Sequence, residues 1–351
     1  MMKKVLLGTL LAGVVVLPAM AQSNVTLFGV LDVNLESINN LAGGSPGSGR
    51  TTRETSDGLY GSRWGFKGTE DLGNGYKALF TLEGGFRVDT GANSSSDKLF
   101  GRLSFVGIEN KELGTVTVGR QYTAMFDIIN PYFPLTRAPQ YEPYAQIESI
   151  YTDNSIKYVK TTGDLKVAVH YGLGEVAGNS SAGKNYSAGF SYTPGPFGVT
   201  VSADQTNTAA STAAATLGNT GYNRKIALAG KYQWGNATFS AGHRLGRQKA
   251  ASGIQSQRDT LSWAGVGYNF TPLLNGAIGY YYQDIEQSNT MTKGNPQQVG
   301  ARLTYVLSKR TDVYAVAAVV KNAALNFNAL STLETGATTQ NAVAVGIRHL
   351  F

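Results

Sequence analysis

Alternation of apolar and polar side chains, running from residue 24 to the C-terminus, constrains the fold of this chain more than any other feature. In the first run, Val25, Leu27 and Leu31 hold odd positions, whereas Asp32 and Glu36 hold even positions. Alternation with a period of two predicts a β-strand that has one apolar and one polar face. Comparable runs predict sixteen strands, near residues 24–37, 58–70, 76–89, 98–109, 115–121, 154–161, 165–172, 184–193, 198–207, 222–233, 237–246, 258–269, 276–287, 296–307, 311–322 and 338–351.

The spacers between these runs alternate between a short and a long class. The short ones are 71–75, 110–114, 162–164, 194–196, 234–236 and 308–310, and the long ones are 38–57, 122–153, 173–183, 208–221, 247–257 and 323–337. Short turns at one end and long loops at the other are typical of an up-and-down barrel in an outer membrane. The predicted fold is therefore all-β, a 16-stranded antiparallel transmembrane β-barrel.

Charged residues at the polar positions of the predicted strands decide which face of the barrel wall points inward. Pairs such as Glu83 with Arg87, and Arg63 with Lys67, would be costly to bury in a dry core. Sixteen strands also enclose a bore too wide for side chains to fill, so it holds water. We therefore expect polar side chains to face the bore and apolar side chains to face lipid.

The N-terminus and the composition limit the domain organisation of the chain and the kinds of site that it can hold. Residues 1–21 combine Lys3 and Lys4, a 13-residue apolar run and the ending Ala19-Met20-Ala21, which predicts a signal peptide cleaved between Ala21 and Gln22. Residues 22–351 are then one barrel domain with a net charge of +5, because two of the 30 basic and none of the 23 acidic residues leave. The chain has no cysteine, so it has no disulfide and no thiolate metal site.

The spacer 122–153 is the longest of all. It carries four prolines and is rich in Tyr, Phe and Ile. A connection of this length in a compact domain is either functional or disordered, and its aromatic content argues against disorder. We expect this third long loop to fold inward and narrow the bore.

Several motifs resemble the trimeric general porins of Gram-negative outer membranes. They are VTLFG at 25–29, SRWGFKGTEDLGNG at 62–75, RLSFVG at 102–107, GRQY at 119–122, NSIKY at 154–158, and the terminal Phe351. The resemblance implies a homotrimer in the outer membrane, in contact with lipid and lipopolysaccharide, through which small hydrophilic solutes and ions diffuse passively. It also implies that the barrel-insertion machinery recognises Phe351. No enzymatic activity, cofactor or nucleic-acid partner is expected.

The resemblance further implies a constriction in which loop acids face a basic wall. Arg63 and Arg102 match the arginine positions of the family and lie opposite in parity to their apolar neighbours, so both should point inward. Arg87 shares parity with Glu83 and joins them. Lys157 replaces an arginine that many family members carry just before the NSIKY run. On the loop, Asp127 stands at the family spacing, and Glu142, Glu148 and Arg137 are candidates by location.

Arg120 shares parity with Val116 and Val118 and should therefore face outward. An arginine that faces lipid is costly near the midplane of the membrane. The family places this position at the subunit contact. We expect Arg120 to bind Asp97 or a loop carbonyl of a neighbouring subunit.

The basic balance and the arginines favour a channel that prefers anions. Two alternatives to a general diffusion channel stay open. One is a substrate-specific channel with an aromatic track, formed by Tyr122, Tyr132, Phe133, Tyr141 and Tyr144. The other is an adhesive or structural barrel whose loops bind a host partner. The three histidines lie far apart without the spacing of metal ligands.

Overall fold

The computed structural model describes residues 24–42, 49–135, 138, 140–143, 150–208, 220–252, 255–287, 292–322 and 331–351. The side chains of residues 287 and 292–294 lie outside this description. The expected signal peptide, 1–21, also lies outside the described residues, as do Arg137, Tyr144 and Glu148.

Strands make up almost all of the regular structure. They are β1 Asn24–Asn39, β2 Arg50–Ser56, β3 Arg63–Gly73, β4 Tyr76–Gly85, β5 Leu103–Asn110, β6 Gly114–Tyr122, β7 Tyr151–Thr162, β8 Leu165–Gly172, β9 Asn185–Tyr192, β10 Phe197–Thr208, β11 Gly221–Trp234, β12 Ala237–Lys249, β13 Gln255–Asn269, β14 Leu274–Gln287, β15 Thr292–Gly294, β16 Gln297–Val306, β17 Thr311–Lys321 and β18 Gln340–Leu350. Helix α1 (Ala124–Ile129) and a 3₁₀ turn (Asn130–Tyr132) follow β6.

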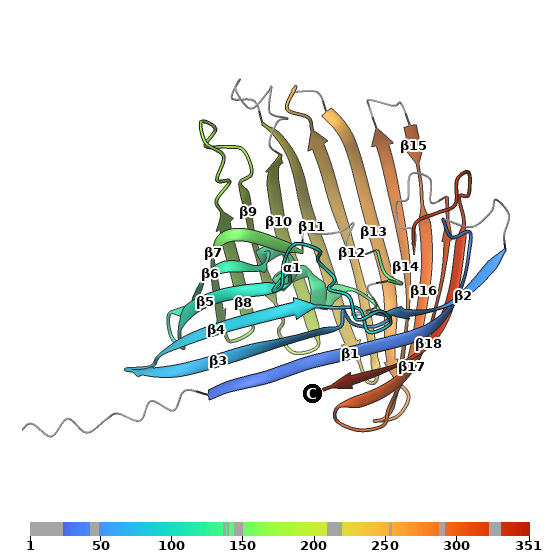
Figure 1. Ribbon diagram of the computed structural model, residues 1–351, viewed down its shortest axis with the longest axis horizontal. Coiled ribbons are helices and arrows are strands. Elements are labelled where there is room, and N and C mark those ends of the chain that lie inside the picture. The colour runs from blue at the N-terminus through green and yellow to red at the C-terminus, as the bar shows by residue number, and fades with distance from the viewer. Residues whose placement is uncertain are drawn as a thin grey trace, which may run out of the picture.

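These segments form one closed antiparallel barrel. β2 and β3 both pair with β1, and β15 and β16 both pair with β14, so each couple is one barrel strand in two pieces. Eighteen segments minus these two duplications give sixteen barrel strands, which confirms the predicted fold. β1 runs almost across the view in Figure 1, whereas β12 to β14 on the far wall run almost upright, as expected for tilted strands in a barrel.

The barrel closes between its first and last strands. β18 pairs with β1 from Val30 opposite Leu350 to Ile38 opposite Ala342. The terminal residue extends the seam, because Phe351 and Gly29 exchange backbone hydrogen bonds of 3.0 and 3.1 Å. The ring of Phe351 lies directly over the α-carbon of Gly29.

The two parities of β1 have opposite surroundings. Val25, Leu27 and Leu35 are 55–60% exposed on the outer face, while Asp32 and Glu36 are fully buried on the inner face. The other strands present apolar residues such as Val118 and Leu228 outward in the same way. The predicted inversion, with polar side chains inside and apolar side chains outside, is confirmed.

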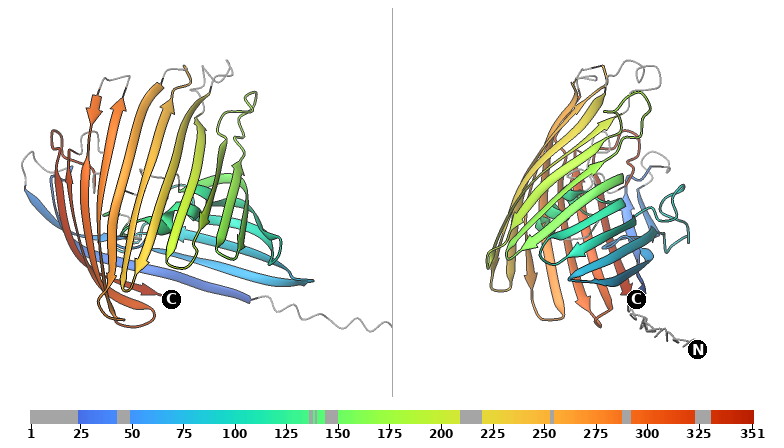
Figure 2. Two further views of the ribbon diagram at one scale, coloured as in Figure 1. Left: turned by 180° about the vertical axis from the view of Figure 1, so that it is seen from behind. Right: turned by 90° about the vertical axis from the view of Figure 1, so that its left-hand side faces the viewer.

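Turns and loops separate to opposite ends of the barrel, as Figure 2 shows from two further sides. Residues 74–75, 111–113 and 235–236 connect strands at one end, whereas 86–102 and 173–184 are long connections at the other. Within the described ranges, no helix is long and apolar enough to cross a membrane.

The strand prediction fails at three places. The predicted strand 58–70 begins only at Arg63, and β2 occupies part of the predicted loop 38–57. Residues 57–62 between β2 and β3 leave the wall instead. The predicted strand 76–89 ends at Gly85, and the predicted strand 98–109 begins at Leu103. The connection between them, 86–102, is therefore a long loop, the second in chain order, and it makes the segment after β6 the third.

The contact of Phe351 with Gly29 allows us to test how much the seam between β1 and β18 stabilises the closed barrel. A β-carbon at Gly29 would lie 2.2 Å from the Phe351 ring and 2.8 Å from the carbonyl oxygen of Arg63, so Gly29→Val should destabilise the barrel by about 1–3 kcal/mol. The loss of heat-resistant mobility on gels measures this.

Gly230→Val is the matched control. Gly230 also faces outward from a strand, and its nearest neighbour would lie 3.6 Å from the new β-carbon. Equal melting temperatures of the two variants would show that the contact between Phe351 and Gly29 contributes nothing to the stability of the barrel.

Candidate functional site

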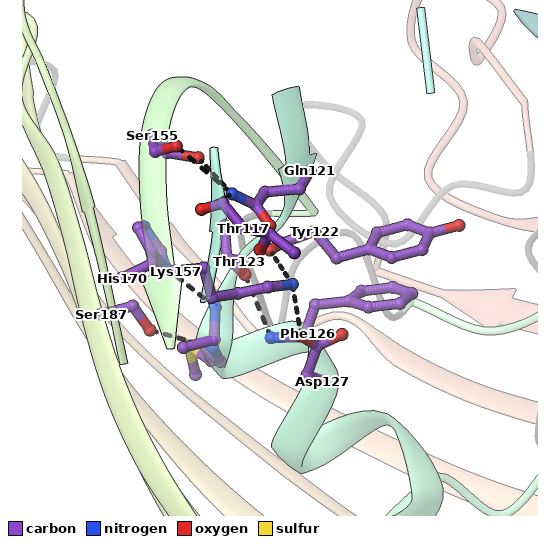
Figure 3. A network of polar contacts seen from close by, with 12 residues as sticks. Thr117, Gln121, Tyr122, Thr123, Phe126, Asp127, Ser155, Lys157, His170 and Ser187 are labelled. Atoms are coloured by element: carbon purple, nitrogen blue, oxygen red, sulfur yellow. Dashed lines mark hydrogen bonds and ion pairs between the residues drawn. The ribbon is translucent and has the colours of Figure 1, made fainter. Parts of the chain in front are cut away.

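The segment after β6 lies against the inner face of the barrel wall, where its backbone amides bond to side chains of the wall. Thr123 caps α1 by accepting a hydrogen bond from the Phe126 amide at 3.0 Å. The next two free amides also find acceptors, since Ala124 donates to His170 Nδ1 and Met125 to Ser187 Oγ, both at 2.9 Å. Figure 3 shows these three contacts around the start of the helix. The first turn of α1 therefore has no unsatisfied amide that would favour water.

Side chains and carbonyls later in the segment bond to strands on other parts of the barrel. The Trp263 indole on β13 donates to the Tyr132 carbonyl at 3.1 Å. On β16, Arg302 donates to the Leu135 carbonyl at 2.8 Å and Gln298 to the Tyr141 carbonyl at 2.6 Å. These donors project from the inner face, so the described part of the segment is anchored to that face at several points.

Tyr141 adds a contact to the first strand. Its hydroxyl donates to Glu36 Oε1 at 2.8 Å, and burial together with the Glu36 carboxylate raises the pKa of Tyr141 far above its usual range. The phenol therefore stays protonated and acts only as a donor. Arg53 balances the other side of Glu36 at 2.7 Å.

Apolar packing reinforces this anchoring. Met125, Ile129, Tyr132 and Phe133 form one buried cluster with inward residues of β11, β13 and β14. Leu135, Ala138 and Tyr141 join a second cluster with β17 and β18. Tyr132, Phe133 and Tyr141 are at most 2% exposed, so they cannot form the stacking track of the substrate-specific alternative. Their burial removes three of its five residues.

The predicted loop acid Asp127 and the predicted wall base Lys157 meet directly. Lys157 Nζ lies 2.6 Å from Asp127 Oδ2 and 3.0 Å from the Tyr122 carbonyl oxygen (Figure 3). Lys166 from β8 donates to the Asp127 carbonyl at 3.0 Å. The acid and the base neutralise each other, so this pair mainly holds the start of the loop.

Arg63 and Arg102 lie together and share one carboxylate. Arg102 Nε is 2.5 Å from Glu83 Oε1, and its Nη2 donates to the Tyr122 hydroxyl at 2.9 Å. Arg63 Nε is 3.8 Å from Glu83 Oε2, and among the described residues its guanidinium makes no hydrogen bond. A carboxylate that is already bonded to Arg102 leaves most of the Arg63 charge uncompensated.

The remaining predicted constriction residues are placed differently. Arg87 does not belong to the wall, because β4 ends two residues earlier and the Arg87 side chain is exposed in a turn. Glu142 is only 4% exposed, and it accepts hydrogen bonds from the Leu135 amide at 3.1 Å and from the Tyr281 hydroxyl. Sequence position suggested that Glu142 faces solutes, but these contacts make it an internal brace of the loop.

Residues 57–62 form an element that the alternation pattern missed. The Asp32 carboxylate on the inner face of β1 accepts the amides of Gly58, Leu59 and Tyr60 at 2.9–3.1 Å. These bonds hold the segment on the inside of the wall. Tyr60 thereby lies between two guanidinium groups, with Arg63 5.0 Å and Arg348 4.9 Å from its ring centre.

Three hollows follow one another past these elements. The first, of about 500 Å³, is lined by Tyr60, Arg63 and Arg102, and the second, of about 410 Å³, shares Leu59, Tyr60 and Asn130 with it. The third, of about 200 Å³, shares Pro131, Asn275 and Arg302 with the second. The charged residues that line the three are the bases Arg63, Arg102, Lys231, Arg302 and Arg348 and the acids Asp57, Glu142 and Asp312. Bases thus outnumber acids five to three along this described path.

Three of these bases were missed from the sequence. Arg302 and Arg348 sit on β16 and β18, and Lys231 sits on β11, far along the chain from the loop. Their inward parity was the available signal, since Arg302 alternates with Leu303 and Arg348 with Ile347. Their proximity to the loop required the closed barrel.

Arg120 has partners within its own chain. A β-bulge between Gly119 and Gln121 places it just off the regular alternation. Its Nε donates to the Gly101 carbonyl at 2.8 Å, and its Nη1 lies 2.5 Å from Asp153 Oδ1. The predicted partners were Asp97 or a carbonyl of a neighbouring subunit, whereas the acid and the carbonyl observed here belong to the same chain.

No group of three or more His, Asp or Glu side chains among the residues the structure describes could hold a metal ion. The site is instead a set of paired and unpaired charges around connected hollows. Such a site can orient water and attract ions.

Comparisons with known proteins agree with this architecture. Residues 8–325 match the family model of the Gram-negative porin. Outer membrane porin protein 32 of Delftia acidovorans is 30% identical over 355 residues, which cover 95% of each chain. The solved anion-selective porin from Comamonas acidovorans is 25% identical, with a TM-score of 0.74 over 94% of this chain and all of that one.

A third likeness concerns the fold alone. OmpT of Vibrio cholerae, solved in a trimer form, is 17% identical, with a TM-score of 0.69 over 94% of this chain and 99% of that one. The family match spans most of the sequence and the barrel is closed around a polar interior. The chain therefore belongs to the Gram-negative porin family and forms a channel in the outer membrane through which small solutes diffuse passively.

Proposed function

We propose that this channel favours anions and that its constriction lies between the segment after β6 and the wall that carries Arg63 and Arg102. The observation that carries the proposal is the Arg63 guanidinium, which lines the first hollow and has no hydrogen-bond acceptor among the described residues. Arg302 and Lys231 continue the basic lining through the next two hollows. The anion selectivity of the Comamonas porin is consistent with this arrangement.

The preference arises from pairing rather than from the total charge. Glu83 is bound by Arg102, Asp127 by Lys157 and Asp312 by Arg348. Carboxylates held in this way repel passing anions weakly, whereas the donors of Arg63 stay available. A row of such groups raises the local concentration of anions without holding them tightly, as passage requires.

The remaining predicted residues have secondary roles in this proposal. Arg87 would act from the rim of the second long loop. Arg137 and Glu148 would act from the part of the third loop that lies outside the described residues. Catalysis has no part in the proposed function.

Replacing Arg63 tests the proposal. A unit charge ~8 Å from an ion in water contributes roughly 0.5 kcal/mol, which is about twofold in local ion concentration. Removing the charge should lower the local anion concentration about twofold and raise the local cation concentration about twofold, so Arg63→Gln should lower the anion-to-cation permeability ratio about fourfold. The reversal potential of reconstituted channels in a potassium chloride gradient measures this ratio.

Arg258→Gln is the matched control, because Arg258 is exposed on the outward parity of β13 and should not affect the ratio. A wild-type reversal potential that favours cations would refute the proposal.

We also propose a homotrimer. Outside the wall, Arg120 and Lys98 both bind Asp153, at 2.5 and 2.9 Å, at the foot of the second long loop. Charged groups on an outward face are costly against lipid and better placed at a subunit contact. The exposed Asp97 lies in the same loop, and a hydrogen bond from Ser95 lowers its pKa. In this proposal Arg120 orients the loop that reaches the neighbouring subunit.

Arg120→Gln should weaken the trimer. It removes one hydrogen bond and a partly exposed ion pair, together worth about 1 kcal/mol per subunit after screening. The temperature at which trimers become monomers on gels should fall, while Arg310→Gln, in an exposed short turn, should leave it unchanged. A lower stability of the isolated barrel with unchanged trimer melting would assign Arg120 a role within one chain only.

Two further proposals rest on the resemblance and on sequence. Phe351 would be read by the barrel-insertion machinery, and the yield of folded barrel in cells that express a chain without Phe351 measures this. Residues 1–21 would be removed on export, and N-terminal sequencing of the protein from outer membranes locates the cut.

Lipopolysaccharide is the lipid partner that the outer face favours. Arg224, Arg247 and Arg258 stand directly opposite one another on β11, β12 and β13, close to the ends that lead into the long loops. Like charges in register destabilise a sheet. Arg224 binds Gln205 at 2.7 Å, and neither Arg247 nor Arg258 makes a hydrogen bond or ion pair with a described residue.

A phosphorylated lipid would relieve this repulsion, because arginine binds phosphate oxygens in pairs. A hollow of about 390 Å³ lies beside Arg224 on the outer face, and its lining includes Ala188, Ala203 and Ile226. An acyl chain fits this apolar surface while its phosphate reaches the arginines. We therefore propose that the row binds the phosphates of lipopolysaccharide.

The double variant Arg247→Gln with Arg258→Gln tests this. Purified protein should retain several-fold less lipid A than the wild type when measured by native mass spectrometry, and the difference should vanish for dephosphorylated lipid A. Arg310→Gln serves as the control. Equal retention by the double variant and the wild type would contradict the proposal.

A further inference from the structure

The first hollow is lined by two arginines, by the acids Asp57 and Glu142, and by aromatic rings. Four half-exposed rings line it beside Arg63 and Arg102, namely Tyr60, Tyr122, Phe126 and Tyr151. They come from separate places in the chain: the segment 57–62, the end of β6, helix α1 and the start of β7. The buried aromatic residues of the same loop serve as anchors, so these four form a distinct set that faces the water.

Three of the rings form a stack with one open end. Tyr122 lies between Phe126, at 4.4 Å and 13° between planes, and Tyr151, at 5.1 Å and 23°. Figure 3 shows the rings of Tyr122 and Phe126 face to face. The Tyr151 end is occupied, because Arg120 lies 5.0 Å and Arg102 5.8 Å from its ring centre. The ring of Phe126 has no other ring or cation contact among the described residues, and Phe126 lines the hollow, so this end of the stack is the one at which a further ring can add.

Arg63 presents donors to the hollow, while Arg102 adds its charge beside them, because its Nε and Nη2 already bond to Glu83 and to the Tyr122 hydroxyl. Arg63 lies over the Tyr60 ring, and a guanidinium that stacks through its face keeps its N–H edge free for a carboxylate. Arg63 makes no hydrogen bond with any described residue, and its side chain is 15% exposed. The hollow has a volume of about 500 Å³, enough for a single six-membered ring with a carboxylate.

We infer that this hollow is a weak binding site for aromatic carboxylates, with the carboxylate on Arg63, next to the charge of Arg102, and the ring against Phe126. This inference rests on the proposed anion-favouring function and names a solute class within it. Arginine binds carboxylates through paired donors, and offset ring stacking adds a preference that a saturated ring of the same charge lacks. A solute bound by both groups passes the constriction in preference to a simple anion.

Partial block of the chloride current measures the binding. Single channels of the full-length protein in planar bilayers, bathed in potassium chloride, are titrated with benzoate, cyclohexanecarboxylate or acetate. Half-block should require roughly two- to tenfold less benzoate than cyclohexanecarboxylate, which matches benzoate in charge and approximate size. Acetate should block least.

Two variants separate the contribution of ring stacking to binding from the contribution of charge. Phe126→Leu should bring benzoate to the level of cyclohexanecarboxylate. Phe239→Leu, on the outward face of β12 and 43% exposed, is the matched control and should keep the wild-type difference. Arg63→Gln should weaken block by all three anions.

The outcomes distinguish the two claims. Equal block by benzoate and cyclohexanecarboxylate in an anion-favouring wild-type channel would overturn the inference and leave the proposed function intact. A benzoate preference that survives Phe126→Leu would overturn it as well. A cation-favouring reversal potential would refute the proposed function itself.

Discussion

Closure of the hydrogen-bonded ring between β1 and β18 is the constraint on which the rest of the structure depends. A sheet in a membrane cannot leave an edge, because unpaired amides and carbonyls have no water to bind there. Once the ring is closed, each strand has one face toward lipid and one toward the bore, so charge can accumulate only inside or near the rims. The fully buried Asp32 and Glu36 on β1 follow from this rule, and so does the outward position of Leu35 on the same strand.

A closed ring of sixteen strands creates a second requirement, because the interior must be structured without being filled. The chain meets it with two segments that leave the regular pattern. Asp32 holds residues 57–62 through three backbone amides, and His170 and Ser187 hold the start of α1 in the same way. In both cases a polar side chain of the wall binds backbone groups, which fixes the position of a segment while leaving its own side chains free to face water. Tyr60 and Phe126 reach the first hollow for this reason.

The alternation of side chains was enough to predict the strand number, the inversion of polarity and the inward direction of Arg63 and Arg102. It failed where the chain departs from a period of two. The β-bulge at Arg120 and the departure at residues 57–62 change direction without a change of composition, and the bonds that cause them join residues 26 to 33 positions apart. Glu142 was misplaced for a related reason, since its brace, Tyr281, is 139 residues away. Arg302 and Arg348 carried the right parity, but only the curvature of the barrel brings them close to the loop.

The aromatic residues show how one residue type divides into two roles within a single loop. Tyr132, Phe133 and Tyr141 face the wall, where each covers apolar strand residues. Tyr122 and Phe126 face the hollow, where burial is incomplete and guanidinium groups lie nearby. The buried set anchors the described part of the loop to the wall, and this anchoring holds the exposed rings beside Arg63 and Arg102. Any selectivity of the pore for the shape of a solute, beyond its charge, therefore depends on residues that the solute never touches.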